Sequence, residues 1–142
     1  MTPKTLHGTL VIKERLRKWR HAELLEAENL VEQAQQAVDD RAQRHAKTAA
    51  LLTRSGDFSP HELVHAADQL GIAQKALEAA KLALGERMEE RDQRKAVAGE
   101  ATREVKAIEV LHERLVKEQR RVADQREQAE LDERSASRGR AR

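Results

Sequence analysis

The sequence predicts an all-α protein in which two long helices form one antiparallel coiled-coil hairpin, with the C-terminal helix longer and overhanging. Only the stretch from Arg54 to Pro60 combines glycine, serine, aspartate and proline in the manner of a turn. Both flanks carry apolar residues at alternating spacings of three and four, which is the coiled-coil pattern. Because this pattern continues further after the turn than before it, the second helix is expected to be longer than the first.

The composition favours a two-helix seam over a multilayer core. The 142 residues include one Phe, one Trp and no Tyr, so the chain lacks the bulky side chains that fill such a core. Charged residues reach 37%, which would indicate disorder if the apolar residues were not periodic. The absence of Cys excludes disulfides and thiolate chemistry. No apolar run approaches the roughly 20 residues of a membrane span, so a cytoplasmic protein is expected.

The expected elements are a first helix over about residues 9–54, a turn over 55–59 and a second helix over about 60–134. The first helix begins either near Thr2-Pro3 or after Gly8. The start of the second helix is marked by a capping box and by proline at the first helical position, in the sequence Ser59-Pro60-His61-Glu62. Residues 135–142 are expected to form a basic, flexible tail.

The seam positions indicate how the helices pair. If Leu52 faces Leu63 across the turn, the numbers of paired residues add to about 115, and everything beyond about Val105 overhangs. An eleven-residue step from Trp19 to Leu30 predicts a local shift of the heptad in the first helix. Three arginines occupy seam positions of the second helix, and acidic partners are expected across the seam: Arg87, Arg91 and Arg94 near Glu28, Glu26 and Glu23.

Two sequence features invite alternative interpretations. His61-Glu62-Leu63-Val64-His65 matches the H-E-x-x-H pattern of zinc hydrolases, but Glu62 is already explained by the capping box and no third ligand is apparent. We therefore expect no catalytic residue, metal or cofactor, and keep a zinc hydrolase only as a remote alternative. Trp19 either anchors a partner or packs inside the hairpin with Leu16.

Basic residues gather at both ends of the chain, although the net charge is only +2. In a hairpin these two ends are expected to meet, and the resulting basic surface suits an acidic protein partner. The overhang adds an apolar stripe surrounded by basic residues. Such a stripe implies a partner, either another protein or a second hairpin. The stripe consists of Val105, Ile108, Leu111, Leu115 and Val122.

Two stretches of the last third carry a resemblance to a known family. The first is Ala101-Thr102-Arg103-Glu104-Val105-Lys106-Ala107-Ile108-Glu109-Val110-Leu111-His112-Glu113-Arg114, which is similar to a Lys-x-x-Glu-x-Leu-x-x-Arg stretch. The second is Glu127-Gln128-Ala129-Glu130-Leu131-Asp132-Glu133, which is similar to a Glu-Gln-x-Glu-x-Asp-Glu signature. With these stretches the chain resembles the FliJ/YscO family, the central stalk proteins of flagellar and injectisome type III secretion.

The resemblance implies a non-enzymatic stalk or adaptor that inserts into the pore of the hexameric export ATPase and promotes its assembly or activity. It further implies contacts with the export gate membrane protein and with export chaperones, at the cytoplasmic face of the secretion apparatus. Nucleic acid is not an expected partner. The alternative is a self-associating structural adaptor. The overhang and the resemblance together predict twelve ATPase-binding residues: Arg103, Lys106, Ile108, Glu109, Leu111, Arg114, Leu115, Lys117, Arg121, Gln128, Asp132 and Glu133.

Overall fold

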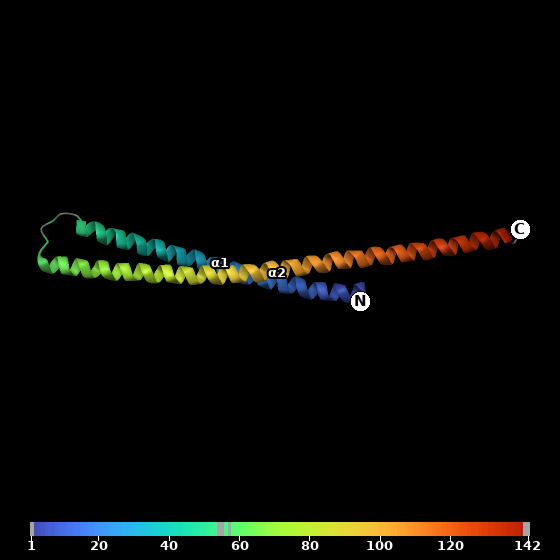
Figure 1. Ribbon diagram of the computed structural model, residues 1–142, viewed down its shortest axis with the longest axis horizontal. Coiled ribbons are helices and arrows are strands. Elements are labelled where there is room, and N and C mark those ends of the chain that lie inside the picture. The colour runs from blue at the N-terminus through green and yellow to red at the C-terminus, as the bar shows by residue number, and fades with distance from the viewer. Residues whose placement is uncertain (1, 54–55, 57, 141–142) are drawn as a thin grey trace. The chain divides into compact units, whose positions relative to one another are not determined.

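The computed structural model describes residues 2–53, 56 and 58–140, and it consists of two helices that pack against each other as a hairpin (Figure 1). Helix α1 spans Pro3–Thr53 and helix α2 spans Pro60–Arg140. The all-α hairpin with a longer C-terminal helix is thus confirmed. Both helices exceed their expected ranges, since α1 begins before residue 9 and α2 continues beyond residue 134 to Arg140. The tail expected from residue 135 is therefore helical as far as Arg140.

The early start of α1 has a local cause in its first residues. The Thr5 backbone amide donates to Thr2 Oγ1 at 3.3 Å, and the Leu6 amide donates to the Thr2 carbonyl at 3.0 Å. Thr2 therefore caps the helix, and Pro3 occupies the first position, where its missing N–H costs nothing. Of the two starts considered from the sequence, the cap at Thr2-Pro3 prevails, and Gly8 lies inside the helix.

The helices divide into two compact units, one of residues Arg20–Ala98 and one that joins Met1–Trp19 with Gly99–Arg142. In the first unit the buried apolar residues include Ala27, Val38 and Leu77, all at expected seam positions. Leu63 is 45% exposed, so it does not occupy the buried seam position that was expected opposite Leu52. The expected contact of Arg94 with Glu23 is confirmed, and the residue numbers of this pair add to 117 rather than 115.

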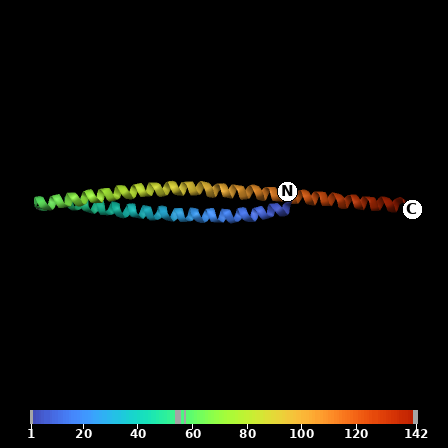
Figure 2. The same cartoon turned by 90° about the horizontal axis from the view of Figure 1, so that it is seen from below.

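The second unit shows the same register. Leu6, Ala101 and Val105 are its buried residues. Lys13 Nζ lies 3.1 Å from Glu104 Oε2, and these residue numbers also add to 117. In Figure 2 the N-terminal residues lie beside α2, which then continues past them. With this register Pro3 lies opposite about residue 114, so α2 extends alone only beyond about Val116, and the overhang expected from Val105 begins about eleven residues later.

The seam of α1 differs from the expected one around Trp19. Trp19 is 61% exposed, whereas Arg17 and Arg20 are only partly exposed. With these two arginines, the covered positions of α1 continue at spacings of three and four without interruption. The heptad shift expected between Trp19 and Leu30 is therefore absent from the burial pattern. The register places Arg17 within about one residue of Ala101, and Arg20 within about one residue of Ala98, so long arginine stems lie beside small buried residues. Within the described residues neither helix contains a stretch long and apolar enough to cross a lipid bilayer.

Candidate functional site

The H-E-x-x-H stretch forms the first turn of α2, and its glutamate takes part in helix capping. The Ser59 amide donates to Glu62 Oε2 and the Glu62 amide donates to Ser59 Oγ, each at 3.3 Å. This reciprocal pair is the expected capping box. His61 and His65 are both exposed. Among the described residues no three potential metal-ligating side chains come together, so the geometry offers no zinc centre of three protein ligands.

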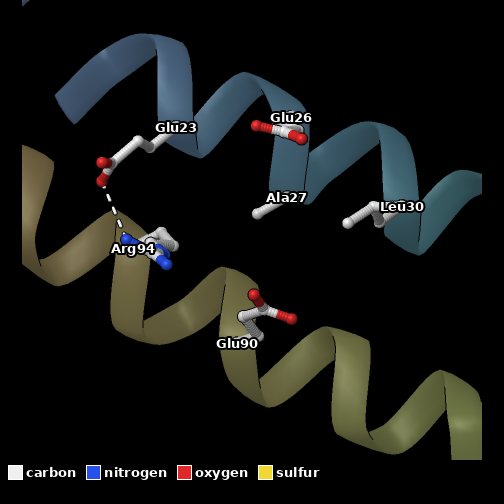
Figure 3. A pocket seen from close by; sticks show the side chains of 6 residues that line it. All are labelled: Glu23, Glu26, Ala27, Leu30, Glu90 and Arg94. Carbon is white, nitrogen blue, oxygen red and sulfur yellow. Dashed lines mark hydrogen bonds and ion pairs between the residues drawn. The ribbon is translucent and has the colours of Figure 1, made fainter. Parts of the chain in front are cut away.

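A pocket of about 240 Å³ lies in the arginine-rich part of the seam (Figure 3). Its lining residues are Glu23, Glu26, Ala27, Leu30, Glu90 and Arg94. Arg94 Nη1 donates to Glu23 Oε2 across the seam at 2.8 Å, and Arg20 Nη1 donates to the same oxygen at 3.3 Å. Glu23 therefore joins both helices, and this contact accounts for the polar lining of the pocket.

The other two expected cross-helix ion pairs are not formed. Arg87 pairs with Glu90 at 3.3 Å and Arg91 pairs with Asp92 at 3.0 Å, both within α2. The physical reason is distance along the chain: a partner on the same helix, three residues away for Arg87 and one residue away for Arg91, is reached in any register, whereas a partner across the seam requires one register. Of the three arginines only Arg94 thus ties α2 to α1 by a charged contact, and the pocket is a structural feature of the hairpin.

The twelve predicted ATPase-binding residues fall into two groups. Seven lie in the part of α2 that runs alongside α1, namely Arg103, Lys106, Ile108, Glu109, Leu111, Arg114 and Leu115. The side chains of Ile108 and Leu115 are partly covered there, and Leu111 is 44% exposed. His112, rather than Leu111, occupies the seam position, and its ring centroid lies 6.1 Å from that of His7. The remaining five are Lys117, Arg121, Gln128, Asp132 and Glu133, and all are exposed.

The segment of α2 beyond the start of α1, residues 117–140, is here called the C-terminal extension. All its side chains are exposed except Val122, which is partly exposed. Its charges fall into three bands: residues 117–126 carry four basic and two acidic side chains, residues 127–133 carry four acidic ones, and residues 134–140 carry three arginines. The apolar stripe expected for the overhang is mostly covered by α1, so the extension is a charged helix with only Val122, Leu131 and alanines as apolar groups.

Contacts one turn apart support this extension. Arg121 pairs with Glu118, and Gln128 Nε2 donates to Asp132 Oδ1 at 3.1 Å. The hydrogen bond and the charge of Arg121 lower the pKa of the Glu118 carboxyl below its ordinary value, and Glu118 raises the pKa of Arg121. Exposed pairs within one helix contribute little, so they cannot alone hold an isolated helix of this length.

The two basic ends of the chain do not meet as the hairpin interpretation expected. The register places the residues near Lys4 beside α2 residues before Val116. Arg134, Arg138 and Arg140 stand at the far end of the extension instead. The difference in length between the two helices, 51 and 81 residues, is the cause.

A basic groove that the sequence analysis did not single out lies in the Arg20–Ala98 unit. It has a volume of about 460 Å³. Helix α1 lines it with Arg41, Arg44, Lys47 and Thr48, and helix α2 lines it with Gln69, Ile72, Ala73 and Ala76. The sequence does contain a sign of this groove. Arg41, Arg44 and Lys47 are spaced by three residues, which places them on one helix face.

Comparison of the chain with protein-family models, with curated proteins and with solved structures found no match. The geometry itself defines a two-helix hairpin with a charged helical extension.

Proposed function

We propose that the chain is a non-enzymatic stalk or adaptor of a type III secretion system, and that its C-terminal extension inserts into the pore of the hexameric export ATPase. In this role it promotes assembly or activity of the ATPase and links it to the export gate and to export chaperones. The proposed place of action is the cytoplasmic face of the secretion apparatus.

One observation carries the proposal: α2 continues alone for more than twenty residues beyond the start of α1. A single exposed helix of that kind is marginal in water and gains stability from a partner that surrounds it. A ring pore surrounds a single helix on all sides. The three charge bands of the extension supply alternating contacts for such a lining, and the resemblance of residues 101–114 and 127–133 to the FliJ/YscO family agrees with this role.

The covering of Val105, Ile108 and Leu115 by α1 changes which residues are assigned to the contact. The contact with the ATPase is therefore assigned to basic residues of the extension, above all Lys117 and Arg121, in place of the apolar stripe. Charged contacts of this kind act on association rate and salt dependence more than on the affinity at high salt.

The test is stimulation of ATP hydrolysis by a hexameric export ATPase from the same genome, measured over a range of concentrations of the chain. We expect stimulation by the full chain and none by a variant that ends after Val116. Circular dichroism of the shortened variant should show the hairpin intact, because α1 and its partner residues remain. Full stimulation by the shortened variant would remove the extension from the mechanism.

A charge-reversal pair sharpens the assignment. The double variant Lys117→Glu with Arg121→Glu should weaken stimulation most at low salt, since screening at 0.15 M salt already limits exposed charges to about 8 Å. Lys75→Glu with Lys81→Glu is the matched control, because it changes the net charge equally at exposed positions outside the extension. A self-associating adaptor without ATPase contact is the alternative, and it predicts a stable dimer with no effect on hydrolysis.

A further inference from the structure

The basic groove of the Arg20–Ala98 unit has two walls of different chemistry. Its α1 wall presents Arg41, Arg44 and Lys47, and its α2 wall presents Ile72 with two alanines. Ile72 is 61% exposed, so its side chain is accessible to an occupant of the groove. A volume of about 460 Å³ is within the range of ligand pockets and accommodates a few side chains.

The positive charge of the groove is not neutralised within the part of the chain that the structure describes. No ion pair joins Arg41, Arg44 or Lys47 to an acidic group among the described residues. Asp40 lies one turn before Arg44, yet it forms no ion pair with it. The residues that line the groove include three basic side chains and no acidic one.

These walls select an occupant that is anionic on one side and apolar on the other. Single-stranded nucleic acid is disfavoured, since it is bound through aromatic side chains that stack on bases and the groove contains none. An amphipathic acidic helix meets both requirements, because carboxylates and an apolar side chain can share one of its faces.

The chain itself contains such a helix in its extension. Asp124, Glu127 and Leu131 stand at spacings of three and four, so they share one face of α2. All three are exposed, and Leu131 exposes 49% of its surface. The same chain cannot fold this segment back into its own groove without breaking α2, which is continuous from Pro60 to Arg140.

We propose that the basic groove binds the segment 124–131 of a second copy of the chain, which makes the groove a self-association surface. Asp124 and Glu127 then face the basic wall, and Leu131 contacts Ile72 and the alanines beside it. An isologous dimer fills both grooves at once, because each copy contributes one groove and one segment. This inference goes beyond the stalk proposal and does not depend on it.

The experiment uses full-length protein in sedimentation equilibrium at low salt. Wild type should dimerise. The groove variant Arg44→Glu with Lys47→Glu, and the segment variant Asp124→Lys with Glu127→Lys, should each associate with itself about tenfold more weakly or worse, since like charges then oppose each other. Mixing the two variants should restore association, because both contacts of the mixed dimer are again between opposite charges.

The control Lys75→Glu with Lys81→Glu alters exposed lysines outside the groove and should associate like wild type. Equal loss in this control, failure of the mixture to associate, or a monomeric wild type would each overturn the proposal. Binding of a peptide of residues 120–134 by a chain that stays monomeric would assign the groove to a different acidic protein. Groove-dependent binding to anionic vesicles by a monomeric chain would assign it to a membrane surface.

Discussion

Replacing Leu6 by alanine tests the register directly, because this residue is buried only if α1 begins at Pro3 and lies along α2. Leu6 is 2% exposed. Truncation to alanine removes three buried carbons, which at about 0.8 kcal/mol each is a loss of about 2.4 kcal/mol. The usual additional cost of a cavity should be small, since a two-helix seam lies close to water that can fill the gap. We therefore expect a loss of about 2–3 kcal/mol, near the lower end for buried leucines.

The same substitution at Leu131 is the matched control, because this leucine lies in the extension and is 49% exposed. Alanine forms helix as well as leucine does, so the expected change there is below about 0.5 kcal/mol. Urea unfolding followed by circular dichroism gives the global change, and amide exchange of residues 3–16 locates it. Equal small losses at both sites would show that α1 does not pack where the structure places it.

Three further predictions concern polar contacts. Glu23→Gln should cost about 0.5–1 kcal/mol, because it weakens the partly exposed contact with Arg94, and added salt should reduce the difference from wild type in urea unfolding. Ser59→Ala should cost about 1 kcal/mol and speed amide exchange in the first turn of α2, since it removes half of the capping box. Glu118 has a lowered pKa, so its pairing with Arg121 is present at neutral pH and is lost as the pH falls through that lowered pKa. A carboxyl NMR titration should show this lowered pKa returning toward its ordinary value in Arg121→Gln.

The fold class could be predicted from spacing alone, whereas the register could not. Spacings of three and four tell which residues face the partner helix, but sliding one helix by a few residues leaves an alanine-rich seam almost equally buried. The register is fixed by individual contacts: Arg94 with Glu23 was expected from the seam, whereas Lys13 with Glu104 was not. The spacing also does not reveal the length of α1. The cap at Thr2 lengthens this helix, and the added residues cover part of α2 that was expected to overhang.

The seam near Trp19 shows where hydrophobicity misleads. Leu16 and Trp19 are the most apolar residues there, and their positions predict a shifted heptad. The observed seam continues through Arg17 and Arg20, because an arginine stem packs as an aliphatic chain beside small residues. This packing buries Arg17 Nε without a hydrogen-bond partner among the described residues. A small residue opposite a long basic one was the available signal, and it requires the register to be known first.

The candidate surfaces are linked, because segment 124–131 belongs both to the extension proposed to enter an ATPase pore and to the contact proposed between two copies. One copy of the segment cannot occupy both places at once, so the two binding events must oppose each other. The ATPase should then dissociate the dimer, and raising the concentration of the chain should lower stimulation per molecule. Arg44→Glu with Lys47→Glu leaves the extension unchanged, so this variant should stimulate at lower concentrations than wild type does. Lower stimulation by the groove variant would show that the groove assists the ATPase contact instead of competing with it.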